Sequence, residues 1–160
     1  MNEPKKHINH MVFNVRNLDE AVRFYTEVVG MKVVMRFDDR KMAFLSFGDH
    51  LGDIRLFETG ATKDPDRQTN GFNHVAFEPE GGLPALEQLH RRLIEKGVKI
   101  DRLEEFAHGR HKGIYFFDPD GNRLEIFSQE MPPQAAKDYL HDARDAADVM
   151  RPLDLEPASR

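Results

Sequence analysis

The order of apolar and polar positions along the chain predicts alternating strands and helices. Apolar residues alternate with polar ones, as in strands with one buried face, in residues 8–15, 52–58 and 72–79. In residues 113–127 two apolar runs flank a Pro-Asp-Gly-Asn turn, which predicts a β-hairpin. Apolar residues recur three and four positions apart, as in amphipathic helices, in residues 17–29 and 83–97. Gly30 and Gly97 are expected to end these helices, because glycine readily adopts the left-handed conformation found there.

The same succession of elements occurs twice. The segments "INHMVFNV" (8–15) and "FNHVAFEP" (72–79) share an Asn-His pair followed by two apolar residues and Phe. The segment "GDIRLFE" (52–58) matches "NRLEIFS" (122–128) when Ile54 is aligned with Leu124. The repeat predicts an α+β fold of two βαβββ modules, over residues 7–58 and 72–128.

The segments outside the modules have different compositions. Residues 59–71 contain the Gly, Pro, Asp and Asn typical of a surface loop. Residues 129–160 are interpreted as a C-terminal helical extension: a proline start, an Ala-rich helix and a frayed end at "RPLDLEPASR". The helix is expected to pack on the domain or on a second subunit, and no chemistry is assigned to it.

Strand alternation places charged side chains opposite the apolar faces. His10, Arg55, His74 and Glu125 all point away from the apolar side of their strands. The repeat pairs His10 with His74 and Arg55 with Glu125. Two imidazoles and a carboxylate match the ligand set of non-haem Fe(II) oxygenases, and they also permit Mn(II), Zn or Ni. The alternative is that the histidines are structural and that Glu125 faces water.

Composition excludes several classes of function. The 160 residues suffice for one compact domain, and 39% hydrophobic with 32% charged residues suits a soluble globular protein. No apolar run is long enough to cross a membrane, and no signal-peptide pattern opens the chain, so we expect a cytoplasmic protein without a membrane partner. The net charge of −5 disfavours nucleic acid as a partner, and the absence of cysteine excludes thiolate ligands.

Three stretches resemble the vicinal oxygen chelate superfamily: "NHMVFNVRNLDEAVRFYTEVVGMKVV", "NHVAFE" and "GIYFFDPDGNRLEIF". This superfamily includes glyoxalase I, fosfomycin-resistance transferases, bleomycin-binding proteins and extradiol dioxygenases. The resemblance covers residues 7–128. It implies that the two modules form a curved, incompletely closed mixed sheet with helices outside, that His10, His74 and Glu125 bind a metal, and that the protein is a homodimer.

The extradiol branch, similar to catechol 2,3-dioxygenase, fits the sequence best. Arg55 stands where glyoxalase I has a fourth ligand, and Val12 stands where fosfomycin-type transferases have a hydroxyl. The resemblance therefore implies ring cleavage of a small aromatic diol, or reaction of another oxygen-rich small molecule. Dioxygen would be the co-substrate and Fe(II) the metal, with Mn(II) or another divalent ion as the alternative.

The resemblance also suggests residues for acid–base chemistry. Tyr115 matches a tyrosine that contacts the substrate. The preceding loop "AHGRHKG" supplies His111, favoured as the histidine near the reacting oxygen, and His108, a second candidate for contact with substrate. Gly52 occupies the position of the usual acid–base histidine, and His50 is the possible substitute.

Three further side chains are candidates for substrate binding. Arg55 would neutralise a carboxylate or oxyanion of the substrate, or form a salt bridge to a neighbouring acid. Phe57 and Phe127 would stack on an aromatic ring, or simply fill the interior.

Two other kinds of function stay open. One is a different metal-dependent enzyme of this superfamily: a glyoxalase-like lyase, an isomerase or a fosfomycin-type transferase. The other is a non-catalytic protein that binds a small molecule, for example in resistance. The presence of all three proposed ligands favours an enzyme, because a sequestering protein would not need them together.

Overall fold

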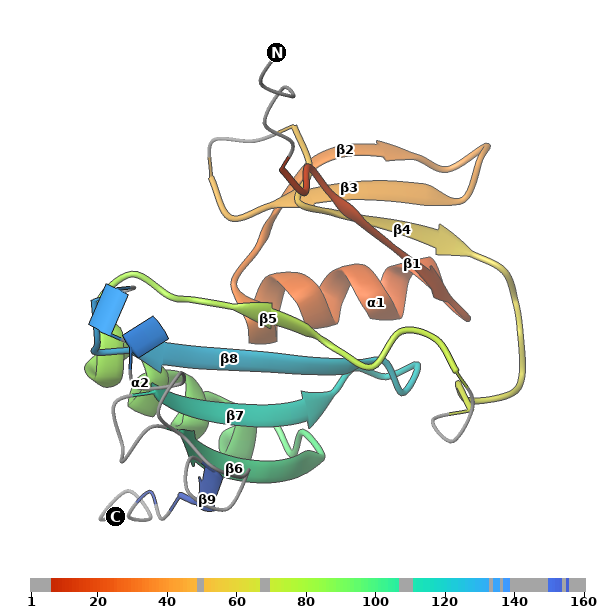
Figure 1. Cartoon of the computed structure of the whole chain (residues 1–160). Helices are drawn as coiled ribbons and strands as arrows, with labels where there is room; N and C mark the ends of the chain where they lie inside the picture. Colours follow the sequence, from red (N-terminus) through yellow and green to blue (C-terminus); the bar gives the residue numbers. More distant parts are fainter. Residues whose placement is uncertain are drawn as a thin grey trace. The chain divides into compact units, whose positions relative to one another are not determined.

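The chain divides into two compact units, Met1–Pro65 and Asp66–Arg160 (Figure 1). The structure is a computed structural model that describes residues 7–48, 51–66, 70–106, 111–132, 134–135, 137–138, 150–153 and 155. Each unit is built around one β-sheet, and the two are described separately below.

The first unit contains β1 (Met11–Val15), α1 (Leu18–Phe24), a π-helical turn η1 (Tyr25–Val29), β2 (Lys32–Phe37), β3 (Met42–Ser46) and β4 (Ile54–Glu58). Its sheet has the order β1-β4-β3-β2, with β1 parallel to β4 and the other pairs antiparallel. Helix α1 contacts β3 and β4 and covers one face of this sheet (Figure 1).

The second unit contains β5 (Val75–Phe77), α2 (Gly82–Glu95), β6 (Ile100–Phe106), β7 (His111–Phe117), β8 (Arg123–Gln129) and β9 (Met150–Pro152). Its sheet has the order β5-β8-β7-β6-β9, with β5 parallel to β8 and the other pairs antiparallel. Helix α2 contacts β7 and β8 on one face, and it lies behind these strands in Figure 1.

The predicted repeat is confirmed by the order of the elements, by the strand pairing and by a β-bulge found in each unit. Each unit begins with a strand, a helix and three further strands. The first strand of each unit pairs in parallel with its fourth strand, β1 with β4 and β5 with β8. A β-bulge interrupts the register between Val33 and Met35 in β2 and between Ile100 and Arg102 in β6. The α+β class and the two βαβββ modules follow from these observations.

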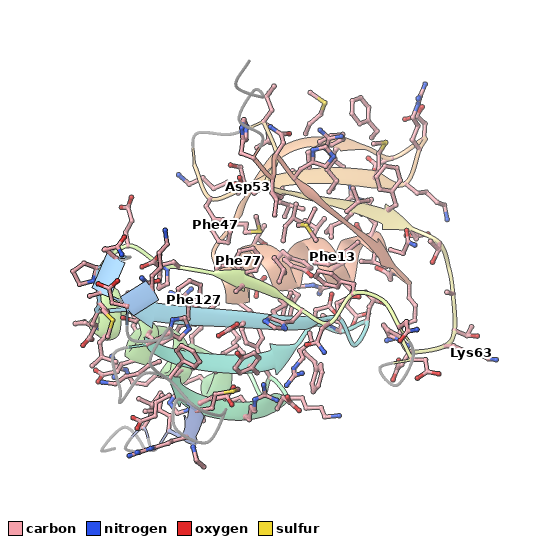
Figure 2. All side chains as sticks on the ribbon, viewed as in Figure 1. Phe13, Phe47, Asp53, Lys63, Phe77 and Phe127 are labelled. Carbon is pink, nitrogen blue, oxygen red and sulfur yellow. The ribbon has the colours of Figure 1, made fainter. Side chains whose placement is uncertain are left out.

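The predicted apolar strand faces form the cores. In the first unit the ring of Phe13, labelled in Figure 2, stacks on Tyr25 with a centroid distance of 6.1 Å. The second unit buries the corresponding side of β7 and β8 against α2. The buried residues include Phe13, Val15, Ile54 and Leu56 in the first unit and Leu86, Leu93, Ile114, Phe116, Leu124 and Ile126 in the second.

The first helix differs from the expected single α-helix. Its α-helical part ends at Phe24, and a π-helical turn continues to Val29. The Thr26 hydroxyl donates to the carbonyl oxygen of Val22 at 2.9 Å. Such a bond competes with the regular backbone ladder and favours a wider turn. Both predicted glycine ends are confirmed, with φ of 90° at Gly30 and 65° at Gly97.

The C-terminal segment contains a strand that the sequence pattern missed. Part of the predicted frayed end instead forms β9, which adds to the edge of β6. Two cross-strand pairs stabilise it: Phe106 opposite Met150 and Glu105 opposite Arg151. Of the preceding predicted helix, residues 134–135 and 137–138 are helical, Met150 belongs to β9, and residues 133, 136 and 139–149 lie outside the described residues.

The link between the units is irregular and exposed over residues 59–66, as predicted, while residues 67–69 lie outside the described part. Over the ranges that the structure describes, none of the helices is long and apolar enough to cross a membrane.

Burial of His90 on α2 predicts that stability falls in mild acid. Its imidazole is 8% exposed, and burial, reinforced by the neighbouring charge of Arg91, lowers its pKa. The unfolded chain, with an ordinary pKa of about 6.5, therefore takes up this proton at higher pH than the folded chain does. Hence the free energy of unfolding decreases as pH falls below about 6.5, by at most about 1.4 kcal/mol per pH unit for one proton.

We expect His90→Gln to lose less stability than the wild type between about pH 7 and pH 5, because it removes this proton uptake. Urea unfolding across that range measures the difference. Equal slopes in the two proteins would contradict the assignment.

Candidate metal centre

Strand register places Glu125 in the middle of one polar sheet face. Glu125 in β8 pairs with Ala76 in β5 on one side and with Tyr115 in β7 on the other. The opposite face of β8 carries Leu124 and Ile126, which are buried in the core. We call the polar side the site face; it comprises the side chains of His74, Arg102, His111, Tyr115, Arg123, Glu125 and Phe127.

His74 and Glu125 form the closest pair on the site face. Nε2 of His74 lies 3.0 Å from Oε2 of Glu125, and Nδ1 of His74 lies 2.8 Å from Oδ1 of Asn73. An amide oxygen only accepts hydrogen bonds, so Nδ1 carries a proton. Nε2 then faces a carboxylate, and this contact is favourable only when a proton or a metal cation lies between the two atoms.

A second set of contacts holds Asn73 in place. Nη1 of Arg123 donates to Oδ1 of Asn73 at 3.4 Å, and Nη2 of the same guanidinium forms an ion pair with Asp101. The chain of contacts Asp101–Arg123–Asn73 therefore ends at the imidazole of His74. Such support fixes the orientation of a metal-ligating histidine.

Tyr115 approaches Glu125 from the neighbouring strand. Its hydroxyl hydrogen-bonds to the Glu125 carboxylate, while the guanidinium of Arg102 lies 4.3 Å from the centre of its ring. Burial and, next, the charge of Glu125 raise the pKa of the Tyr115 hydroxyl. Tyr115 is therefore a hydrogen-bond donor at neutral pH rather than a base.

His111 stands on the other side of the carboxylate. Its Nε2 is 3.7 Å from Oε1 of Glu125, and its ring stacks on Phe127, labelled in Figure 2, with a centroid distance of 4.5 Å. The prediction that His111 lies in a loop is wrong: it is the first residue of β7 and pairs with Phe106. The pairing extends the strand back to His111, where the half-buried ring of Phe106 lies edge-on to the imidazole with a centroid distance of 5.9 Å.

Glu125 is charged in spite of its burial. The residue is 5% exposed, and burial alone raises the pKa of its carboxyl group. The His111 and Tyr115 side chains, together with the nearby His74, outweigh that effect and leave the pKa below its ordinary value. A buried anion surrounded by donors is the kind of group that a divalent cation binds.

The first unit repeats part of this arrangement. Nδ1 of His10 lies 2.9 Å from Oδ1 of Asn9, as in the Asn73–His74 pair. In β1 and β4, Val12 pairs with Arg55, in the same register in which Ala76 pairs with Glu125. The alignment of Arg55 with Glu125 in the sequence repeat is therefore confirmed by strand pairing.

The Arg55 side chain has an aromatic neighbour and an unsatisfied nitrogen. Its guanidinium carbon lies 4.8 Å from the centre of the Phe44 ring, and its buried Nε has no hydrogen-bond partner. In the described part of the chain, no carboxylate forms an ion pair with Arg55. Phe57, two residues along β4, is half-buried on the same side of the strand.

The predicted site residues fall into three groups. His74, His111, Tyr115, Glu125 and Phe127 lie together in the second unit, and His10, Arg55 and Phe57 lie in the first. His50 and His108 lie outside the described residues. Over the ranges described, no set of three or more His, Cys, Asp or Glu side chains is gathered so that it could hold a metal ion. The three-ligand set therefore stays a prediction.

Sequence reasoning missed the residues that support the candidate ligands. Asn9 and Asn73 were visible as the residue before each repeated histidine, but the pattern assigned them no role. Arg102 and Arg123 carried no distinguishing signal, because a charged residue on a strand most often faces water.

Comparisons with known proteins identify the family. Residues 7–126 match the family described as the "Glyoxalase/Bleomycin resistance protein/Dioxygenase superfamily". The chain therefore belongs to this superfamily, the vicinal oxygen chelate group that its sequence resembles. Members are mostly enzymes, bind small-molecule substrates and generally depend on a divalent metal.

Similar proteins differ in the activities that their names give. The chain is 31% identical over 150 residues to metallothiol transferase FosB of Shouchella clausii, covering 92% of this chain and 94% of that protein. It is 30% identical over 128 residues to catechol-2,3-dioxygenase of Bacillus subtilis, covering 76% of this chain and 41% of that protein. The structure of a glyoxylase/bleomycin resistance protein/dioxygenase domain from Frankia sp. EAN1pec is 25% identical, with a TM-score of 0.62, and covers 79% of this chain and 99% of that one.

The contact between Tyr115 and Glu125 can be measured by a double-mutant cycle. We expect Tyr115→Phe to lower the free energy of unfolding by about 1.5–3 kcal/mol, the value of a hydrogen bond to a charged group. In the Glu125→Gln background the same change should cost less, because the neutral amide needs the donor less. Urea unfolding of the four proteins gives the coupling, and additive effects would show that the two groups do not interact.

Proposed function

We propose that this protein is a metal-dependent enzyme whose ion is bound by His10, His74 and Glu125. The contact between His74 and Glu125 carries the proposal. Nε2 of His74 is 3.0 Å from the carboxylate while Nδ1 is engaged by Asn73, so a proton or a metal cation is needed between two atoms that otherwise both present lone pairs. A divalent metal meets this need.

The donor set fits such an ion. Imidazole nitrogens and one carboxylate, without thiolates, suit Fe(II), Mn(II) or Zn(II). The identical Asn9–His10 pair supports His10 as the third ligand, since its Nδ1 is engaged in the same way and its Nε2 is left for the metal. Arg55 stands at the position equivalent to Glu125, where glyoxalase I has its fourth ligand. Because a guanidinium cannot bind a metal cation, this supports a set of three protein ligands rather than four.

Among reactions of this superfamily, we favour extradiol ring cleavage of a catechol-type substrate with dioxygen, and Fe(II) as the metal. A bound Fe(II) would supply the acidity that ionises the diol and the redox chemistry with oxygen. The aromatic surface formed by Phe127 and the stacked ring of His111 supports a planar substrate beside Glu125.

The protein's own residues have separate roles in this proposal. His111 moves a proton to or from the substrate oxygen, because its ring lies beside Glu125 and imidazole is the side chain best suited to acid–base work near neutral pH. Tyr115 keeps its proton and donates a hydrogen bond. Arg55, which has no ion-pair partner in the described ranges, neutralises an anionic group of the substrate.

A second candidate is a metal-dependent transferase that uses a thiol. The similarity to metallothiol transferase FosB supports it, because that alignment spans nearly all of both proteins, whereas the match to catechol-2,3-dioxygenase spans less than half of the dioxygenase. The two candidates share the metal centre and differ in the co-substrate.

Metal binding is tested by anaerobic purification, reconstitution with Fe(II) or Mn(II), and measurement of the bound metal. We expect the wild type to bind about one ion per chain. Each of His10→Ala, His74→Ala and Glu125→Ala should lower the metal affinity by more than the roughly 10–100-fold that is typical when a residue supporting a ligand is removed. His7→Ala is the matched control, because His7 is exposed and precedes the proposed ligand by three positions. Wild-type binding in the three ligand variants would contradict the proposed centre.

The reaction is tested on the metal-loaded protein. Oxygen uptake with catechols, lost in Glu125→Ala, is the result expected for ring cleavage. Thiol consumption with an electrophilic substrate and no oxygen uptake would favour the transferase. A loaded protein that binds catechols without consuming either would contradict both and favour a binding protein.

A further inference from the structure

Gly113 lies under the carboxylate of Glu125. It sits inside β7, between the pairs that His111 and Tyr115 make with β8, and it is buried. A Cβ atom at this position would be 2.7 Å from Oε1 of Glu125 and 3.5 Å from Cε2 of Tyr115. Real Cβ atoms do not approach an oxygen this closely, so the carboxylate occupies the space that any larger residue would need.

The backbone gives no other reason for a glycine here. Gly113 is not among the residues with positive φ, so every L-residue could adopt its conformation. Glycine inside a strand also weakens the sheet, because it loses more conformational entropy on folding and offers no side chain to pack. The feature that does account for it is the close approach of Glu125.

The carboxylate has little room to move aside. Glu125 is 5% exposed, and its oxygens are flanked by His74 at 3.0 Å and His111 at 3.7 Å. Because the two oxygens belong to one rigid group, displacing Oε1 also changes the contact between Oε2 and His74. A methyl group at position 113 would therefore disturb the Glu125–His74 pair itself.

We propose that Gly113 is a positioning residue that sets where the Glu125 carboxylate lies, and so sets the geometry offered to a divalent cation. The metal part of this inference rests on the proposed function. The steric part, that residue 113 controls the carboxylate, does not.

The test uses Gly113→Ala in the full chain, with Mn(II) affinity as the readout. We expect the affinity to fall about 10–100-fold while the protein stays folded, as for other residues that orient a ligand. Gly48→Ala is the matched control: a methyl group added at Gly48 would meet no atom within 4 Å, and Gly48 has no positive φ, so the same change of residue type should leave affinity unchanged. Wild-type affinity in Gly113→Ala would overturn the proposal.

A second arm separates the steric role from general damage. Glu125→Asp draws the carboxylate back by one methylene, which should make room for a methyl at position 113. The thermal destabilisation caused by Gly113→Ala should therefore be smaller in the Glu125→Asp background than in the wild type. If Gly113→Ala alone does not fold, recovery of folding in the double variant supports the proposal and failure to recover overturns it.

The two arms also distinguish this inference from the proposed function. If the wild type binds no metal, the proposed function fails, and the coupling between positions 113 and 125 still decides the steric claim. Additive destabilisation would then overturn it.

Discussion

A carboxylate buried in a sheet is stable only when donors or cations surround it, and this requirement organises the second unit around Glu125. The residue is almost inaccessible, yet its pKa stays below the ordinary value because His111, Tyr115 and His74 outweigh the effect of burial. Removing these neighbours would leave an uncompensated charge in the sheet. The polar side chains on this face are thus part of what allows the strands to pack as they do.

Two lines of alternating charge converge on that carboxylate. One runs from Asp101 through Arg123 and Asn73 to His74, and the other from Glu104 through Arg102 to Tyr115. Each line begins with a carboxylate that is paired with a guanidinium, and both guanidinium groups also lie within about 5 Å of the centre of the Tyr115 ring. The arrangement orients His74 and Tyr115 without using either as an acid or base. His111, whose Nε2 lies 3.7 Å from the carboxylate, belongs to neither line.

The fold was largely predictable from the sequence and the site only in part. Apolar periodicity, which follows from strand and helix geometry, and the internal repeat marked by the Asn-His pair predicted both modules. Strand β9 was missed because a strand of three residues, one of them Pro152, carries too little periodicity. The supports Asn73, Arg102 and Arg123 were missed because their roles depend on strand register, which a single sequence does not give. Gly113 did carry a signal, since a glycine inside an apolar strand often marks a close approach.

The most direct test of the account is a crystal grown with Mn(II), with diffraction recorded at the manganese absorption edge. The account predicts one anomalous peak per chain, coordinated by Nε2 of His10, Nε2 of His74 and the carboxylate of Glu125, with both Nδ1 atoms still bonded to Asn9 and Asn73. A peak elsewhere, or coordination through Nδ1, would contradict it. So would a chain in which Glu125 contacts His74 and no ion.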